Sequence, residues 1–446
     1  MTDPIRIDRL TLQQFAMMLR HGRGLALMHV LEYGLDEVAH LVLQACLVNQ
    51  AYDPQCEPER SEWLYRMFKG SAQRDSFSDA ILTAMPLTSH CHDIAQLCRL
   101  AALMALDGDL IAATTLRNFV LGQNFSDGLE QFGCDALVML DGLPALVELG
   151  RRFGAMLMSD PAASIEQPDT LMNDFDERAA DLAVLEQLAL QDAALRMYLS
   201  HYQRERLGRH AGSDADLRNT RREQIRRNSP ITSVLKAAQS DTRPARYFFR
   251  AFGMYATQEE LDLVLKRLVS ATEPETCLRL LWIFSSATMP RIEPRVLALA
   301  ENPDREIRDA AHQALSWLPD PAVGRLARGK LQESHLSADD SSVVTLLRKQ
   351  LSPGDDELIL ARLQSLSLSD FEMHRFSCEV VDICAEGDRG AAATLSTWVY
   401  ETTPCSVCRK QSVDRLLELG RVDAGVANEC AFDANPKIVA LSTQAV

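Results

Sequence analysis

The stretch that most constrains the fold reads ENPDREIRDAAHQALSWLPDP, residues 301–321, in which helix-start and helix-stop signals enclose an apolar stripe. Asn302 is a favourable N-cap residue, and Pro303 suits the first helical position, where its missing N–H removes no hydrogen bond. Apolar and small side chains then recur at spacings of three and four from Ile307 to Leu318. Two prolines close the stretch. We therefore predict an amphipathic helix whose alanine-rich face packs closely against a neighbouring helix.

The same design recurs along the second half of the chain. A proline preceded by Glu, Thr or Asn opens further helical patterns at Pro274, Pro404 and Pro436. Pro274 and Pro303 are 29 residues apart, and Pro404 and Pro436 are 32 apart. Periods of about 30 residues are typical of repeats built from two helices. Partner helices are expected at 257–270, 291–300, 321–332 and 388–401, with two less regular pairs at 338–366 and 369–386.

Residues 301–321 resemble the second helix of a HEAT repeat, which commonly begins with Asp or Pro and carries a later arginine and a pair of alanines. These are here Arg308, Ala310 and Ala311. The resemblance covers 257–332 and extends to residue 444. It implies an all-α protein of the armadillo type, a right-handed α-solenoid of HEAT-like helix pairs with an N-terminal helical domain. Fold alone does not fix function, because HEAT arrays scaffold proteins, bind nucleic acids and occasionally carry catalysis.

Composition agrees with a helical protein. Apolar residues make up 47% of the 446 residues and aromatic residues only 6%, which suits helix-on-helix packing. No apolar run reaches the roughly 18 to 20 residues of a membrane-spanning helix, and no signal peptide is recognisable, so we expect a soluble cytoplasmic protein without a membrane partner. The eleven cysteines are scattered through helical patterns, which indicates reduced thiols rather than a disulfide framework.

Charge is distributed unevenly. The net charge is −16, yet residues 196–250 hold 13 basic and 5 acidic side chains. Within them, 216–228 would place arginines along one face of a helix, where they could contact phosphates or another anion. These arginines are Arg218, Arg221, Arg222, Arg226 and Arg227. The alternative needs no ligand, because the preceding residues 159–195 hold nine acidic side chains and one arginine that could pair with the basic stretch.

The same charge pattern suggests the domain boundaries. We predict an N-terminal helical domain at 1–158, a charged middle section at 159–250 and a HEAT-like array at 251–446. The middle section is acidic at 159–195 and basic at 196–250. A loop is expected near 208–219, where Gly, Ser, Asp and Asn are frequent.

One Cys-x-x-Cys pair, Cys405 and Cys408, raises the question of a metal. A structural zinc site needs four ligands, typically a second pair at comparable spacing, and no such pair follows. Cys378, Cys384 or Cys430 could complete a site through the fold. The repeat already accounts for the pair, however, because Cys408 follows its proline by four residues as Ile307 does. We therefore expect no metal and no cofactor, with Cys405 and Cys408 as the candidates if one is bound.

The sequence contains no phosphate-binding loop, zinc-protease helix, nucleophile elbow or dinucleotide fingerprint, so we expect no enzyme. We predict a scaffold that binds a protein partner along its inner helices, with Arg308, Arg409 and Arg415 on the binding face. A nucleic-acid-binding protein is the alternative, acting through 216–228 and related to DNA repair, as in bacterial glycosylases built from HEAT-like repeats. A third hypothesis is that the protein regulates or inhibits an effector protein. Its own acidic surface would then mimic nucleic acid.

Overall fold

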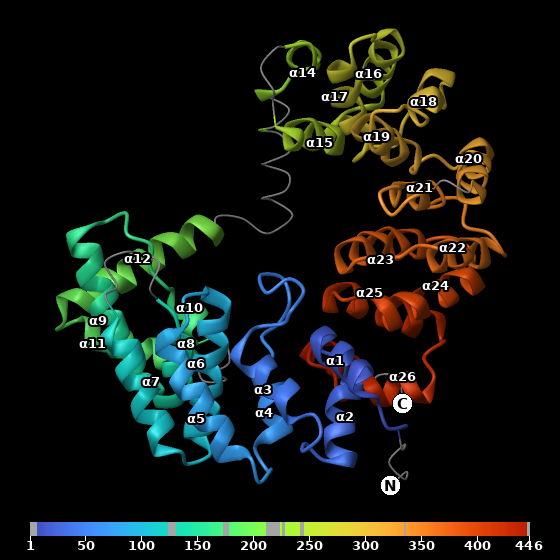
Figure 1. Cartoon of the computed structure of the whole chain (residues 1–446). Helices are drawn as coiled ribbons and strands as arrows, with labels where there is room; N and C mark the ends of the chain where they lie inside the picture. The colour runs from blue at the N-terminus through green and yellow to red at the C-terminus, as the bar shows by residue number, and fades with distance from the viewer. Residues whose placement is uncertain are drawn as a thin grey trace. The chain divides into compact units, whose positions relative to one another are not determined.

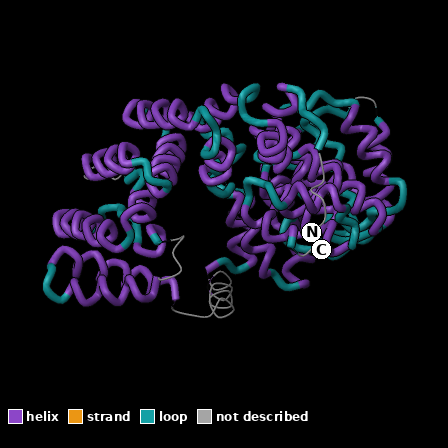
Figure 2. The backbone as a smooth tube through the Cα atoms, turned by 90° about the horizontal axis from the view of Figure 1, so that it is seen from below, coloured by secondary structure: helices purple, strands orange, loops and turns teal. Residues whose placement is uncertain are grey.

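The computed structural model of the chain describes residues 7–123, 131–172, 178–210, 224, 228–240, 245–333 and 336–443. Every regular element within these residues is a helix, and the described part contains no strand (Figure 2). None of the described helices is long and apolar enough to cross a membrane. The predicted all-α class is thus confirmed.

The chain forms two compact units. The first combines residues 1–211 with 424–444, and the second comprises 212–423 (Figure 1). This division differs from the boundaries predicted from the sequence, because the last two helices belong with the N-terminal unit. The chain therefore leaves the first unit, builds the second, and returns to the first.

The first unit is built around α6, which packs against α3, α4, α5, α7 and α8. α6 and α7 form a helical hairpin. Asp109 caps α7 by accepting hydrogen bonds from the backbone N–H groups of Ile111 and Ala112, and Gly108 turns the chain with a φ of 98°. The helices of this unit are α1 (Leu12–His21), α2 (Gly24–Tyr33), α3 (Ala39–Leu47), α4 (Ser61–Phe68), α5 (Arg74–Ala84), η1 (Met85–Leu87), α6 (Cys91–Leu106), α7 (Leu110–Gly122), α8 (Cys134–Asp141), α9 (Leu143–Ser159), α10 (Pro168–Leu171), α11 (Arg178–Ala189), α12 (Ala193–His210), α26 (Ala424–Cys430) and α27 (Pro436–Ser442).

The C-terminal segment is fixed to the start of the first unit by specific contacts. Arg23 and Glu429 form a buried ion pair, with Nε–Oε1 and Nη2–Oε2 distances of 2.8 and 2.6 Å. The Trp63 indole donates a hydrogen bond to the Phe432 carbonyl at 2.8 Å. A Cβ atom on Gly24 would lie 2.0 Å from the Glu429 carbonyl oxygen, so only glycine permits this approach.

In the second unit, alternate helices pack on one another in two layers. Layer A contains α15, α17, α19, α21, α23 and α25, and each of these contacts the next. Layer B contains α14 and the helices that lie between those of layer A along the chain. Within layer B, α14 contacts α16, and α22 contacts both α20 and α24. The bounds are α14 (Ile231–Ala238), α15 (Arg246–Tyr255), α16 (Gln258–Ser270), α17 (Pro274–Phe284), α18 (Pro294–Leu299), α19 (Arg305–Leu315), α20 (Pro321–Gln332), α21 (Ser342–Thr345), α22 (Asp355–Gln364), α23 (Asp370–Cys384), α24 (Arg389–Thr402) and α25 (Ser406–Leu419).

The helix of the 301–321 stretch is α19, and its apolar face is buried as predicted. Its start differs by two residues from the prediction. Asp304, rather than Asn302, is the N-cap, since its carboxylate accepts from the backbone N–H groups of Glu306 and Ile307 at 2.9 and 3.3 Å. Asn302 instead accepts from the Asp304 N–H and so shapes the preceding turn.

Candidate functional site

The three arginines predicted to face a partner all contact the second unit itself. Arg308 donates to the Asn302 carbonyl at 3.0 Å and pairs with Asp340 at 3.1 Å. Arg415 pairs with Glu418 on the same helix at 2.9 Å. Arg409 is 0% exposed and therefore has no surface to offer a partner. Arg308 and Arg415 thus make contacts within the second unit, and Arg409 is enclosed by it.

The basic stretch that could contact an anion lies outside the described residues. Arg218, Arg221, Arg222, Arg226 and Arg227 all fall there, and so does most of the predicted loop at 208–219. The anion-binding hypothesis for this stretch remains a prediction from the sequence.

Exposed carboxylates are distributed over layer A, near the starts of α17 and α21 and near the ends of α23 and α25. We call this set of five the acidic row. Its members lie on or beside layer A helices and are Glu275, Asp339, Asp382, Glu386 and Glu418. Each pairs with a basic side chain of the same unit. Glu275 pairs with Arg279, Asp382 with Arg348, Glu386 with Lys349 and Glu418 with Arg415. Asp339 pairs with Arg305 at 2.6 Å and with Arg375 at 3.7 Å.

In all of these pairs the basic side chain is the more buried partner. The exposed side-chain fractions are 5% for Arg279 against 55% for Glu275, and 10% for Arg348 against 55% for Asp382. The reason is geometric, because a long arginine stem packs along apolar surface while its short carboxylate partner stays at the rim. Although each pair is neutral, the charge that a partner would meet first along this row is negative.

Arg348 shows how firmly these pairs are held. Its guanidinium carbon lies 4.3 Å from the centroid of the Trp317 ring, a cation–π contact, and the same guanidinium pairs with Asp382. The Trp317 indole in turn donates to the Ser285 carbonyl at 3.3 Å. An aromatic ring and an arginine thus fix one acidic side chain in place.

A second feature of layer A is a cluster of thiols and an imidazole between α23 and α25. We call it the thiol–imidazole cluster, and its members are His374, Cys378, Cys405 and Cys408. His374 and Cys378 are four residues apart on α23, so both lie on one face of that helix. Cys405 is the N-cap residue of α25, and Cys408 lies in its first turn.

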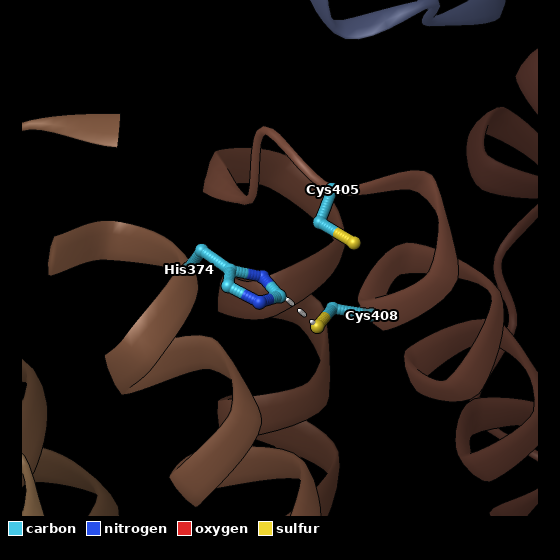
Figure 3. Close-up of side chains that lie close together, drawn as sticks. All are labelled: His374, Cys405 and Cys408. Atoms are coloured by element: carbon cyan, nitrogen blue, oxygen red, sulfur yellow. Dashed lines mark hydrogen bonds between the residues drawn. The ribbon is translucent and has the colours of Figure 1, made fainter. Parts of the chain in front are cut away.

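The cluster members point toward one another. The donor atoms of His374, Cys405 and Cys408 all lie within 4.8 Å of each other (Figure 3). His374 Nδ1 is 3.6 Å from the Cys408 sulfur, and the Cys378 sulfur is also 3.6 Å from that of Cys408. Imidazole and thiol groups are the donors that soft transition metals and zinc prefer. His374, Cys405 and Cys408 could therefore hold a metal between them, and the Cys378 sulfur lies beside this group.

The cluster also perturbs the protonation of its members. Hydrogen bonds with Cys378 and Cys405 raise the pKa of His374 to about 10. The hydrogen bond from Cys408 and the contact with His374 lower the pKa of Cys378 to about 5, although partial burial opposes this shift. The Cys408 pKa is raised by the same hydrogen bond with Cys378. Both shifts favour the charged forms of His374 and Cys378.

Sequence reasoning considered Cys405, Cys408 and Cys378 but not His374. A usable signal was present, because His-x-x-x-Cys on a helix places two metal-ligand side chains on one face.

Comparison of the chain with protein-family models, curated proteins and solved structures finds no significant match to any of the three.

Proposed function

We propose that the protein is a non-enzymatic interaction scaffold whose second unit is a HEAT-like α-solenoid, and that the acidic row of layer A binds a basic segment of a protein partner. The observation that carries this proposal is the ordering of the acidic-row ion pairs, in which the carboxylate is the more exposed member each time. The repeat period of about 30 residues and the alternation of layers A and B support the solenoid.

Electrostatics favour a basic partner over nucleic acid. A protein that binds nucleic acid along an array needs basic side chains exposed along it. In each acidic-row pair the basic side chain is less exposed than its carboxylate, so a lysine- or arginine-rich segment would meet the carboxylates first. Such charge complementarity speeds association and selects partners more than it adds raw affinity. A regulator or inhibitor of an effector protein, the third hypothesis from the sequence, would use the same exposed carboxylates.

The eleven cysteines support a reducing setting for the proposed scaffold, since none of them forms a disulfide bond in the structure. Disulfides are rare in the cytosol, where thiols are kept reduced. We therefore place the scaffold in the cytoplasm as part of the same proposal.

The proposal is tested with two variants of equal charge. Asp382→Asn, Glu386→Gln and Glu418→Gln together neutralise three members of the acidic row. Glu259→Gln, Glu301→Gln and Glu357→Gln neutralise three exposed carboxylates on or beside layer B helices, as a control. Calorimetric titration with a synthetic arginine-rich peptide at about 50 and 150 mM salt measures the affinity of each protein.

We expect the acidic-row variant to bind the peptide about tenfold more weakly than the control, because each exposed pair contributes about 0.2 to 1 kcal/mol. The difference should shrink at the higher salt concentration, where surface charges are screened. If both variants bind the peptide equally weakly, only net charge matters. That result would rule out layer A as the binding face.

A further inference from the structure

We propose that His374, Cys378, Cys405 and Cys408 bind one zinc ion that joins α23 to α25. This inference concerns the thiol–imidazole cluster and is independent of the interaction proposed above. It rests on the placement of four metal-ligand side chains in two pairs, one from each of two adjacent helices of layer A.

Helix geometry brings the two pairs together. The pair on α23 is spaced four residues apart, so both of its side chains leave the helix on the face that meets α25, a neighbour of α23 in layer A. The pair on α25 is spaced three apart and brackets the start of that helix, as Cys-x-x-Cys pairs do in many zinc sites.

The distances suit a tetrahedral ion. With Zn–S bonds of about 2.3 Å and Zn–N bonds of about 2.0 Å, tetrahedral angles separate two sulfurs by about 3.8 Å and a sulfur from a nitrogen by about 3.5 Å. The two sulfurs of Cys378 and Cys408 are 3.6 Å apart. Nδ1 of His374 lies 3.6 Å from the Cys408 sulfur and 3.9 Å from the Cys378 sulfur. Cys405 lies within 4.8 Å of His374 and Cys408, whereas Cys378 is outside this group of three mutually close donors. The side chains of Cys378 and Cys405 would therefore rotate toward a common centre when the ion binds.

The donor set selects the ion. Three thiols and one imidazole offer no oxygen ligand, which excludes magnesium and calcium, and they match the Cys₃His sets of structural zinc sites. Four protein ligands fill a tetrahedral shell, so no position remains for a substrate. Zinc would displace the remaining thiol protons on binding, because thiolates are the ligating form.

Ordinary core packing does not explain the cluster. Cys378 is exposed and His374 is only partly buried, so neither is needed to fill an apolar interior. In the described part of the chain, this is the one group in which three such donors converge. In α25, Cys408 occupies the position that Ile307 occupies in α19, counted from the preceding proline. Ile307 is buried there, and its side chain makes no polar contact. An aliphatic residue would therefore serve packing at this position equally well.

The ion would connect the helices that carry much of the acidic row. Asp382 lies on α23, Glu386 follows it, and Glu418 lies on α25. A bond through the metal between these two helices would fix the spacing of three carboxylates. The zinc site would then have a structural role, as closed four-ligand sites generally do.

The experiment uses the full chain, expressed with added zinc and purified under reducing conditions. Metal content is measured by elemental analysis, and the chelator-stripped protein is titrated with cobalt. Cys405→Ser with Cys408→Ser removes one pair of ligands. Cys56→Ser with Cys91→Ser is the matched control, because it removes two exposed thiols from the first unit.

We expect about one zinc per chain in the wild type and the control, and cobalt spectra with sulfur-to-metal charge transfer and tetrahedral d–d bands. The dissociation constant for zinc should be nanomolar or lower. The ligand variant should lose both signals. A wild type that takes up neither zinc nor cobalt with these bands would overturn the proposal, and so would a ligand variant that keeps them. If the variant does not fold, the thiols of the metal-stripped wild type are alkylated before the cobalt titration. The alkylated protein should then lose the cobalt bands, and bands that remain would overturn the proposal.

Discussion

Replacing Glu429 by glutamine should detach the C-terminal segment from the first unit. In the native fold the Glu429 carboxylate binds Arg23 through two hydrogen bonds, and the two side chains are only 7% and 6% exposed. Glutamine keeps the size of the side chain but removes its charge. The Arg23 guanidinium is then left charged in a buried setting without its carboxylate.

The size of the effect follows from this burial. Breaking a buried ion pair by removing one partner costs about 3 to 5 kcal/mol, because the remaining charge is desolvated and uncompensated. The neighbouring contacts of the segment, including the Trp63 hydrogen bond to the Phe432 carbonyl, are unchanged. We therefore expect local opening of the segment to become easier by about 3 kcal/mol, which raises the open population about 100-fold.

Hydrogen exchange read out by mass spectrometry measures this opening directly in peptides from residues 424–443. The control is Asp141→Asn, which breaks the exposed two-bond pair with Arg117 in the same unit. That change should cost at most about 1 kcal/mol. Replacing both Arg23 and Glu429 by methionine should restore most of the protection, since no buried charge remains. Unchanged exchange in Glu429→Gln, or equal effects of the two amide substitutions, would refute the reasoning.

Three further predictions concern other parts of the chain. Burial lowers the pKa of His312 to about 3 from the unfolded value of 6.5. The stability that the neutral, buried imidazole contributes is therefore complete above about pH 6.5. As the pH falls toward 3, this stability is lost by about 1.4 kcal/mol per pH unit. Urea unfolding at pH 7 and pH 5 should show a smaller drop in His312→Gln than in the wild type, and an equal drop would exclude this role. Gly154→Ala should destabilise the packing of α9 on α12 by about 1 to 3 kcal/mol in thermal unfolding, because its Cβ would lie 1.8 Å from the Ala194 carbonyl oxygen. Gly122→Ala, which meets nothing within 4 Å, should be neutral or stabilising, and a comparable loss there would contradict the steric explanation. Wild-type protein should bind labelled DNA and RNA no more tightly than the variant with Arg218, Arg221, Arg222, Arg226 and Arg227 changed to Glu; salt-sensitive binding lost in that variant would favour the nucleic-acid alternative.

Much of the second unit was predictable because its signals are local. Caps, prolines and apolar spacing placed the partner helices at 257–270 and 321–332, and the structure has helices at Gln258–Ser270 and Pro321–Gln332. The terminal helix was also foreseen, since Asn435 caps it and Pro436 begins it. The packing of the C-terminal segment against α2 was not predictable from the sequence. Gly24 and Arg23 lie some 400 residues earlier in the chain, and no local sequence pattern indicates that they contact this segment.

The sites were less predictable than the helices. The cap and spacing rules say which face of a helix is apolar, but they do not say whether an arginine reaches solvent or folds back onto a carbonyl, as Arg308 does. For the same reason the exposed carboxylates were visible only as net charge. The Cys-x-x-Cys pair was recognised, whereas the approach of His374 depends on how α23 stacks on α25.

Site-specific photo-crosslinking tests the central claim, that a basic partner lies along layer A. A photoreactive amino acid replaces Glu386 beside layer A in one protein and Glu357 on layer B in another, both exposed positions of the second unit. The account predicts crosslinks from position 386 to a basic segment of a partner, and loss of these crosslinks when an arginine-rich peptide competes. Crosslinks mainly from position 357, or crosslinks from 386 that the peptide does not reduce, would contradict it.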